Sequence, residues 1–344
     1  MTIHRLLKWD LEEQKFKHDE QNPIEYDLLV IDEFSMVDIQ LFSQLLKASR
    51  QVIKLLFIGD QDQLPSIAPG NVLKDLIDIK LIESIKLTHI FRQNKKSGII
   101  QLAHLIKENQ FNDFSLFDNY SDLNFIECLN TDICYLASKI INKAVNEGYD
   151  LYDFQILAPM YVGVAGIDAL NESLQSIVNP PHISKKELKV FNRTFREGDK
   201  MLQLKNRVDD NVFNGDIGIL IEIQKKDNFE FLEDKMIIDF DGEIVVYSSS
   251  DFNTVTHAYC ISIHKAQGSE FKIVVLPVLF DYKGMLQKSL IYTAITRTKQ
   301  ALFILGDKKA FRQAISTKEI NNRVSSLEKR FEKNDNELSI YDFD

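Results

Sequence analysis

The stretch Leu-Leu-Val-Ile-Asp-Glu-Phe-Ser-Met, residues 28–36, begins with four apolar residues and continues with two carboxylates. A short apolar run without polar alternation is typical of a parallel strand that helices cover on both faces. Ligands of such sheets bind beyond the carboxyl ends of the strands. We therefore expect Asp32 and Glu33 to lie at the ligand-binding edge of an α/β domain.

Four other short apolar runs end in polar residues in the same way. Together with the first run, they cover residues 26–32, 54–60, 154–160, 271–278 and 301–307. Amphipathic helical patterns lie between them, for example in residues 38–49 and 97–109. Alternating strands and helices predict α/β layers around a parallel sheet.

Residues 186–254 show a different pattern, in which short strands alternate with turn-forming pairs. Asn214-Gly215 and Asp241-Gly242 are two such pairs, and both favour tight hairpins. We expect a small antiparallel barrel inserted into a second α/β domain, which resumes near Val255. Residues 312–344 are charged, lack glycine and proline, and form a tail to which the sequence assigns no role.

Composition restricts the class of protein. The chain has 44% hydrophobic and 27% charged residues, as globular proteins do, and it has no run of about eighteen apolar residues that could cross a membrane. Its three cysteines lack the spacing of a zinc site or a disulfide framework, and its first residues lack a secretory signal. We therefore expect a cytoplasmic protein. The net charge of −10 argues against a surface that is basic everywhere, but a narrow groove lined by a few Lys and Arg residues could still bind nucleic acid.

The Asp32-Glu33 pair suits phosphate chemistry. One carboxylate can hold Mg²⁺ through oxygen ligands, and the next can polarise an attacking water. An ordinary strand end is an equally good reading of the pair alone, because acidic residues favour the N-terminus of a following helix.

A second polar loop follows 26 residues later, in Gly59-Asp60-Gln61-Asp62-Gln63-Leu64-Pro65 and the residues up to Asn71. Prolines and glycines hold such a loop in one conformation. The amide of Gln63 can donate to a phosphate oxygen and accept from a water, so it can sense which nucleotide is bound. A plain surface turn is the alternative.

Six segments, in this order, resemble the motifs of the RecD-like branch of superfamily 1 DNA helicases. They are TIHRLL (2–7), DEFSM (32–36), GDQDQLPSIAPGNVL (59–73), LTHIFRQ (87–93), SIHKAQGSEF (262–271) and YTAITRTK (292–299). The resemblance extends from residue 2 to about residue 307. Ala266 and Thr298 depart from the usual Ser and Ala of the family, and both are exchanges between small residues.

The resemblance implies two RecA-like P-loop NTPase-type motor domains, the first one incomplete, with an inserted SH3-like β-barrel. The implied domains are residues 1–96 for the first motor domain, 97–185 with 255–311 for the second, and 186–254 for the barrel. Residues 11–23 occupy the place of the family's pin or wedge, although they read equally well as a solvated loop.

The resemblance also implies ATP and Mg²⁺ as cofactors. Asp32 would position Mg²⁺, Glu33 would be the general base, and Gln63 would couple the γ-phosphate to domain movement. Arg92 and Arg297 would close on the triphosphate, where guanidinium groups stabilise the transferring phosphoryl group. Further nucleotide contacts would come from Asp60, Gln93, Gly268 and Glu270, with Glu270 near the ribose.

Single-stranded DNA and a duplex fork are the implied partners, with 5′→3′ movement implied by the family alone. The residues expected to contact DNA carry hydroxyl, amide, imidazole, cationic or rigid loop groups. They are Thr2, His4, Pro65, Asn71, Lys200, Lys205, Asn206, Arg207, His264 and Gln267.

No GxxxxGK[ST] loop occurs in the 344 residues. In the family this loop and its strand precede the motif that residues 2–7 resemble, so we expect the chain to begin downstream of them. Without the loop's backbone N–H groups and lysine, most of the phosphate site is missing, and the run at 28–31 is left with an unpaired apolar edge. We expect these residues alone to hydrolyse ATP weakly or not at all.

Two explanations of the missing loop stay open. The chain is the downstream half of a split or misannotated gene, or a separate chain that carries the loop completes it. A non-hydrolysing single-stranded-DNA-binding subunit or remnant is the alternative function. A helicase part of a relaxase or nuclease complex is a weaker alternative, because the sequence has no cluster of nuclease metal ligands.

Overall fold

The computed structural model describes residues 1–10, 13–80, 82–87, 97–226, 232–317 and 327. The chain divides into two compact units. Unit 1 is Met1–Ile90 with Glu319–Asp344, and unit 2 is Phe91–Lys318. Arg92, Gln93 and most of the predicted tail lie outside the described residues.

Unit 1 is built around two parallel strands, β3 (Leu28–Ile31) and β4 (Lys54–Phe57), which pair in register. Helices α2 (Ile39–Ala48) and α3 (Val72–Ile79) follow these strands along the chain. Asp38 begins α2, because its carboxylate accepts hydrogen bonds from the Gln40 and Leu41 N–H groups. In the core, the ring of Phe34 stacks on that of Phe57 at 4.3 Å.

Only one face of this sheet is covered in the described part of the chain. Ile31 is buried in the unit 1 core, whereas Leu28, Val30 and Leu56 are 52%, 46% and 46% exposed. The expectation of strands covered on both faces is therefore wrong for β3 and β4, although it holds for β6 in unit 2. The predicted free edge is observed: among the described strands, β3 pairs with β4 alone.

Short elements precede this sheet. Helix α1 (Ile3–Leu6) leads into a hairpin of β1 (Trp9–Asp10) and β2 (Lys15–Phe16). The aromatic rings of Trp9 and Phe16 meet edge to face at 4.7 Å. The described beginning of the 11–23 segment is thus part of a hairpin and not simply a solvated loop.

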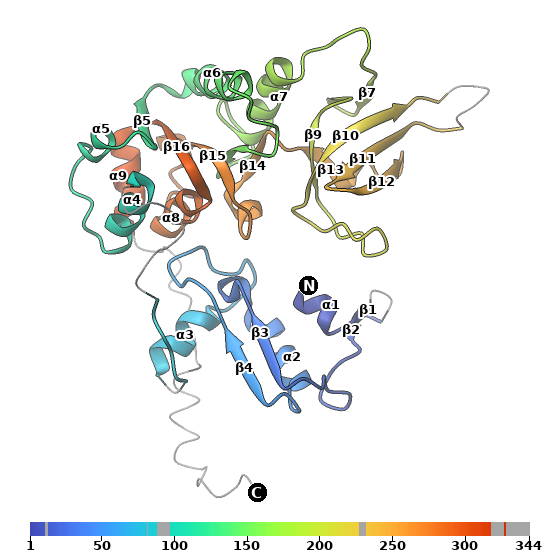
Figure 1. Ribbon diagram of the computed structural model, residues 1–344, viewed down its shortest axis with the longest axis vertical. Coiled ribbons are helices and arrows are strands. Elements are labelled where there is room, and N and C mark those ends of the chain that lie inside the picture. The colour runs from blue at the N-terminus through green and yellow to red at the C-terminus, as the bar shows by residue number, and fades with distance from the viewer. Residues whose placement is uncertain (11–12, 81, 88–96, 227–231, 318–326, 328–344) are drawn as a thin grey trace, which may run out of the picture. The chain divides into compact units, whose positions relative to one another are not determined.

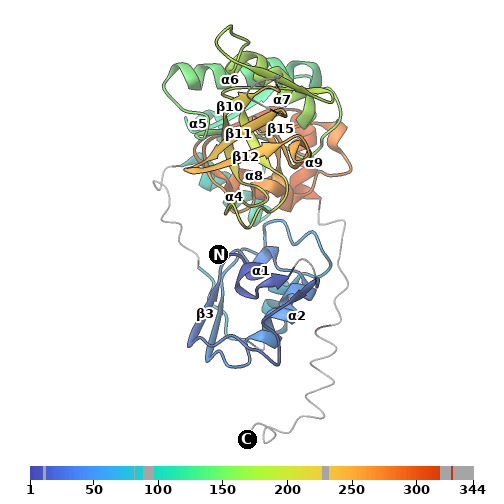
Figure 2. The ribbon, with the colours of Figure 1, turned by 90° about the vertical axis from the view of Figure 1, so that its right-hand side faces the viewer.

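Unit 2 contains a five-stranded parallel sheet in the order β14-β6-β15-β16-β5. Its strands are β5 (Leu123–Glu127), β6 (Phe154–Ala158), β14 (Cys260–Ser262), β15 (Phe271–Val278) and β16 (Thr298–Gly306). Helices α6 (Ile133–Asn146) and α7 (Ile167–Val178) lie together on one side (Figures 1 and 2). Helices α4 (Gly98–Lys107), α8 (Lys288–Thr296) and α9 (Lys308–Ser316) lie on the other. The three apolar runs predicted in this unit are all strands of the sheet.

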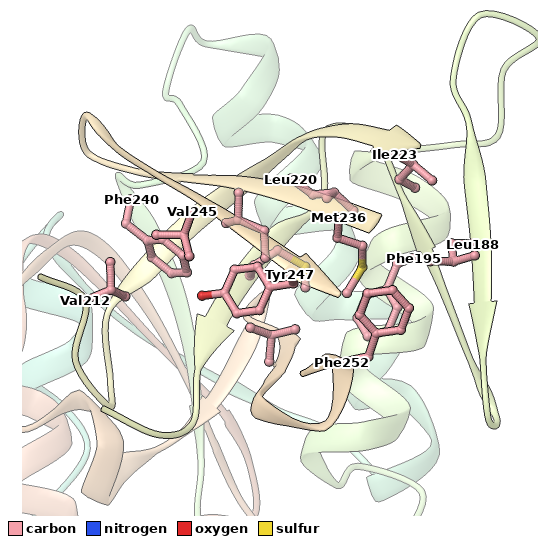
Figure 3. Close-up of a cluster of buried hydrophobic side chains, with 13 residues drawn as sticks. Leu188, Phe195, Val212, Leu220, Ile223, Met236, Phe240, Val245, Tyr247 and Phe252 are labelled. Atoms are coloured by element: carbon pink, nitrogen blue, oxygen red, sulfur yellow. The ribbon is translucent and has the colours of Figure 1, made fainter. Parts of the chain in front are cut away.

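The inserted segment forms a second sheet, entirely antiparallel, in the order β12-β11-β10-β9-β13. Its strands are β9 (Lys200–Gln203), β10 (Ile217–Gln224), β11 (Lys235–Phe240), β12 (Glu243–Ser248) and β13 (Val255–His257). A hairpin of β7 (Glu187–Val190) and β8 (Arg193–Arg196) precedes them. Figure 3 shows the side chains that fill the interior, with Tyr247 and Phe195 among the largest.

The predicted end of this barrel needs a correction. We placed the return to the parallel sheet near Val255, but Val255 and His257 pair with β9 of the barrel. The parallel sheet resumes at Cys260. The short run Val255–His257 is committed to the barrel by its pairing with a strand about fifty residues earlier, which its own sequence does not specify.

The helices of the described part of the chain are all too short or too polar to cross a membrane.

Candidate nucleotide-binding and nucleic-acid-binding sites

The carboxyl end of β3 turns sharply at the predicted carboxylate pair. The N–H of Glu33 donates to Oδ1 of Asp32 at 2.7 Å, and Glu33 has a left-handed φ of +50° at the start of helix η1 (Phe34–Met36). A non-glycine residue in this region costs on the order of 1 kcal/mol or more, and such strain gathers at functional sites. The strain supports a functional reading of the pair over an ordinary strand end.

The loop after β4 packs directly against this turn. The N–H of Phe34 donates to the Ile58 carbonyl at 2.8 Å. A Cβ on Gly59 would lie 3.0 Å from the backbone nitrogen of Ser35, so only glycine lets the two loops approach so closely. The structure therefore brings residues 32–35 and 58–63 together at one edge of the sheet, as the sequence predicts.

Gln63 is held inside this loop by its neighbours. Its N–H donates to the Asp60 carbonyl at 3.2 Å, and its side chain is only 9% exposed. Within the described residues, its Oε1 has no hydrogen-bond partner, and the buried hydroxyl of Ser35 has none either. A buried polar atom left unpaired costs about 1–3 kcal/mol, and such an atom in a native structure calls for an explanation.

The side chains of these two loops have the chemistry needed to bind a nucleotide and its metal. Carboxylate oxygens are ligands that Mg²⁺ prefers, and an amide can bond to phosphate or water. No cluster of three or more His, Cys, Asp or Glu side chains that could hold a metal occurs among the residues described. The carboxylate of Asp32 is a chemically suitable ligand for Mg²⁺ at this turn.

In unit 2, Arg297 follows α8 and is 3% exposed. Three of its hydrogen bonds go to neutral oxygens, namely the carbonyls of Thr293 and Ser269 and the hydroxyl of Thr296, each at 3.3 Å. A guanidinium suits an anion because it stays charged and its planar fork presents several N–H donors.

Glu270 and Gly268 lie in the segment that Arg297 contacts. Phe271, the first residue of β15, donates its N–H to the Arg297 carbonyl at 2.9 Å, and Glu270 pairs with Lys299 at 2.9 Å. This group lies at the amino ends of β15 and β16. The rule that ligands bind at the carboxyl ends of strands, which located Asp32, would not have located these residues.

The barrel meets the motif at 262–271 through a polar chain. Nζ of Lys265, on helix η4 (Ile263–Ala266), donates to Oδ1 of Asn214 at 2.5 Å. The N–H of Asn214 donates to Oδ1 of Asn206 at 2.9 Å. Burial lowers the pKa of the neighbouring His264 below its ordinary value, so His264 is neutral at pH 7 and can bond to nucleic acid through an uncharged ring.

Lys265 and Asn214 were missed by the sequence reasoning. Lys265 stands beside His264 in the quoted motif, so a signal for it was available. Asn214 was read only as half of a turn, and nothing local indicates that this turn contacts residue 265.

The prediction that Lys200 contacts DNA is wrong. We expected it to contact DNA, but it is completely buried, and its Nζ donates to the Phe154 carbonyl at 2.8 Å and to Oε1 of Gln155 at 3.0 Å. An ammonium enclosed in this way cannot reach a phosphate. Basic residues in strands are usually exposed, and here the strand β9 crosses into the junction with the parallel sheet.

The other barrel candidates differ in how accessible they are. Lys205 and Asn206 are exposed. Arg207 is bonded to Asp210 at 2.6 Å and to Asp251 at 3.4 Å, and its guanidinium lies over the Tyr247 ring at 4.8 Å. A phosphate would have to compete with two carboxylates for Arg207.

The candidates of unit 1 lie at helix α1 and in the loop between β4 and α3. Oγ1 of Thr2 caps α1 by accepting from the Arg5 N–H at 3.2 Å, and the ring of His4 lies 5.6 Å from that of Phe16. Asn71 precedes α3 without capping it, and Pro65 is half-buried in the Gln63 loop. Gln267 follows η4 in unit 2, where its N–H donates to the His264 carbonyl.

Three family sequence models match the chain. The one described as an AAA domain matches residues 1–131, and the one described as a UvrD-like helicase C-terminal domain matches residues 257–305. The third, described as the SH3 domain of ATP-dependent RecD-like DNA helicases, matches residues 170–240.

Curated relatives agree with these matches. The chain is 31% identical over 329 residues to the ATP-dependent RecD2 DNA helicase of Deinococcus radiodurans, which covers 95% of this chain and 43% of the relative. It is 29% identical over 366 residues to the RecBCD enzyme subunit RecD of Buchnera aphidicola, covering 91% of this chain and 59% of that subunit. The chain thus spans about half the length of these relatives.

Among solved structures, the Pif1 helicase from Bacteroides in complex with ADP-AlF3 and ssDNA is similar, with a TM-score of 0.55 and 16% identity, over 98% of this chain and 84% of the other. At this identity the similarity shows a common fold. The ordered motifs, the matched RecD-like SH3 domain and the RecD relatives agree, and the chain belongs to the RecD-like family of superfamily 1 helicases.

Proposed function

We propose that the chain is the core of an ATP-dependent DNA helicase, in which ATP hydrolysis drives movement on single-stranded DNA and unwinding of a duplex fork. The observation that carries this proposal is the pair of packed loops in unit 1. They hold a strained Glu33 and a buried Gln63 whose Oε1 lacks a partner among the described residues. The relatives are named as an ATP-dependent DNA helicase and as a subunit of the RecBCD enzyme, and the first name supports the same function.

In unit 1, we assign Asp32 to hold Mg²⁺, which neutralises charge on the phosphates when it is bound. Glu33, next to it, accepts the proton of the attacking water. Gln63 donates its side-chain N–H to the γ-phosphate and accepts a hydrogen bond from that water, which gives its buried oxygen a partner. Asp60 shapes the same loop.

In unit 2, Arg297 stabilises charge on the transferring phosphoryl group, and Glu270 with Gly268 contacts the rest of the nucleotide. We assign Arg92 and Gln93 to the same work from their motif alone. For DNA, the proposed contacts are His264, Gln267, Lys205 and Asn206, joined now by Lys265 and Asn214. Thr2, His4, Pro65, Asn71 and Arg207 remain proposed contacts.

We also propose that these 344 residues by themselves hydrolyse ATP weakly or not at all, because they contain no GxxxxGK[ST] loop. The backbone N–H groups and lysine of that loop supply most of the binding to β- and γ-phosphates. A segment that carries the loop, on the same or a separate chain, would complete the site.

The second candidate is a non-hydrolysing single-stranded-DNA-binding subunit. The contact of Lys265 with Asn214 favours it, because it links the motif at 262–271 to a barrel loop, and both are proposed to contact DNA. The two candidates differ in what happens when the loop is supplied.

The test is phosphate release measured with and without an oligo-dT strand. The 344-residue chain is compared with a chain extended at its N-terminus by a loop-bearing segment of a relative. We expect DNA-stimulated turnover in the extended chain only, lost in Glu33→Gln and kept in the control Glu25→Gln, whose side chain is exposed. Robust turnover by the 344 residues would contradict the requirement for the loop. An extended chain that binds DNA without turnover would favour the second candidate.

A further inference from the structure

Asp199 is a completely buried carboxylate at the junction of the barrel and the parallel sheet. It accepts five hydrogen bonds, from the Arg196 N–H at 2.7 Å, Gln175 Nε2 at 2.6 Å, Asn179 Nδ2 at 2.8 Å, Tyr259 OH at 3.0 Å and His257 Nε2 at 3.1 Å. Burial alone would raise the pKa of Asp199, but the bonds from His257, Asn179 and Arg196 lower it below its ordinary value. The group is therefore a carboxylate held by donors on several sides.

The donors come from the places where the chain enters and leaves the barrel. Gln175 belongs to α7, and Asn179 follows that helix directly before the chain crosses to β7. His257 ends β13, and Tyr259 lies in the return to β14. The Asp199 carboxylate is thus hydrogen-bonded both to the segment that enters the barrel and to the segment that leaves it.

The next residue, Lys200, reaches in the other direction, into the parallel sheet. Its Nζ bonds to the backbone of Phe154 and to the side chain of Gln155 at the start of β6. The Gln155 amide in turn donates to the carbonyls of Ala258 and Tyr259, at 2.9 and 3.0 Å. The ammonium also lies 5.7 Å from the Phe271 ring at the start of β15.

We propose that Asp199 and Lys200, here called the anchor, are positioning residues that make the barrel and the parallel sheet one rigid body. The barrel has an apolar core of its own, so it does not need a buried ion to fold. Buried ions contribute little net stability compared with apolar side chains of equal size. Directional hydrogen bonds, in contrast, hold one relative orientation, whereas apolar contacts tolerate sliding.

The orientation matters because the proposed DNA contacts lie on both sides of the junction. Asn206 and Asn214 belong to barrel loops, and His264 and Lys265 belong to the segment after β14. A single strand can bind both groups at once only if their spacing is fixed, since preorganisation lowers the entropy lost on binding. This step rests on the proposed DNA-binding function.

The test measures the spacing directly. Spin labels are placed at Asn142→Cys on α6 and Ser250→Cys in the barrel, both exposed, with Cys128 and Cys134 replaced by Ser. Distance distributions are recorded by pulsed electron paramagnetic resonance, and binding of an oligo-dT strand is measured by fluorescence anisotropy. The unmodified anchor is expected to give one narrow distribution.

Two variants weaken the anchor to different degrees. Asp199→Asn replaces an acceptor oxygen by a donor, and Tyr259→Phe removes a single hydrogen bond, so it remains informative if Asp199→Asn does not fold. The matched control is Tyr282→Phe, which loses an equally buried hydroxyl bond, to the Ala165 carbonyl at 2.6 Å, within the α/β part. For Asp199→Asn we expect a broadened distance distribution and about tenfold weaker binding of oligo-dT. Tyr259→Phe should change both quantities less, and Tyr282→Phe should change neither.

A distribution that stays narrow in both anchor variants would overturn the proposal, and so would a broadened distribution with unchanged affinity. If the parent chain binds no oligo-dT at all, the DNA-binding function fails and the positioning role falls with it. The distance distributions then still decide whether the anchor makes one rigid body.

Discussion

Gln63 and Lys200 are polar residues enclosed in the protein interior, and each has a different physical explanation. Gln63 carries a buried oxygen without a partner among the described residues, as expected of a group that binds a ligand. Lys200 has its partners, but burial lowers its pKa to about 7.

Replacing Gln63 by Met removes the unpaired oxygen and keeps a similar volume. We expect the free energy of unfolding of unit 1 to rise by about 1 kcal/mol, because the penalty of an unsatisfied acceptor disappears. The fluorescence of Trp9, the single tryptophan of the chain, reports this in urea titrations. Gln40→Met, at an exposed position, is the control and should change little. A loss of stability in Gln63→Met would show that the oxygen is satisfied in solution.

Lys200 should make the stability of unit 2 depend on pH. The pKa of Lys200 is about 7 in the folded protein, against an ordinary lysine value of 10.5. Between these two values the unfolded chain binds more protons, so stability rises with pH. Below pH 7 the lysine is protonated in both states and the dependence ends. From pH 7.5 to 9.5 we expect wild type to gain about 2 kcal/mol relative to Lys200→Met.

Urea unfolding followed by circular dichroism measures this difference, and Lys143→Met, at an exposed position of α6, provides the comparison for an ordinary lysine. Parallel pH profiles of wild type and Lys200→Met would mean that Lys200 stays charged in the folded protein.

At the scale of elements, the two loops of unit 1 depend on their close approach. Strands β3 and β4 end at the same edge, and Gly59 is the residue at which the second loop touches the first. The sequence predicts that both loops lie at this edge, because parallel strands present their carboxyl ends together. It does not predict the contact itself, which depends on the path of the backbone after each strand.

Gly59→Ala should destabilise unit 1 by on the order of 1–3 kcal/mol, since the added methyl group would lie 2.8 Å from Leu73 Cδ2 and 3.0 Å from the Ser35 nitrogen. The added Cβ of Gly284→Ala meets nothing within 4 Å, so this variant should be near neutral. Thermal unfolding by circular dichroism compares them, and Trp9 fluorescence assigns the loss to unit 1. Equal stability of the two variants would show that the loops can move apart at little cost.

At the scale of the whole molecule, the net charge of −10 leaves nucleic-acid binding to a few local contacts. Lys265 is the cation that the structure adds to this set, beside the exposed Lys205. Each phosphate neutralised on a single strand changes the slope of log K against log salt by about 0.7.

Lys265→Met should therefore weaken oligo-dT binding and reduce that slope by about 0.7, with no effect of strand sequence. Lys143→Met, remote from the barrel on α6, should leave the slope unchanged. The measurement is a series of anisotropy titrations between about 50 and 200 mM salt. An unchanged slope for Lys265→Met would remove Lys265 from the proposed contacts.

The sequence by itself determined the features that depend on neighbouring residues. Apolar runs gave three of the five strands of the parallel sheet in unit 2 and both strands of the parallel pair in unit 1. Asn-Gly and Asp-Gly pairs gave hairpins of the barrel, and ordered motifs gave the family. These signals are local, because backbone preference and side-chain pattern are properties of short segments. Two strands of the parallel sheet in unit 2 were missed. Leu123–Glu127 has the mixed sequence LNFIE without a continuous apolar run, and Cys260–Ser262 is only three residues long.

Only the tertiary structure decided which polar groups are enclosed and which reach the surface. The sequence does not distinguish Lys200 from Lys265. In the structure, Lys200 is buried between the two sheets, whereas Lys265 bonds to a barrel loop 51 residues away. Likewise the pairing of Val255 with β9 and the side-chain bonds from Gln175, Asn179, His257 and Tyr259 to Asp199 join segments that are far apart in the chain. Burial and hydrogen bonding are set by such distant partners, so no local pattern contains them.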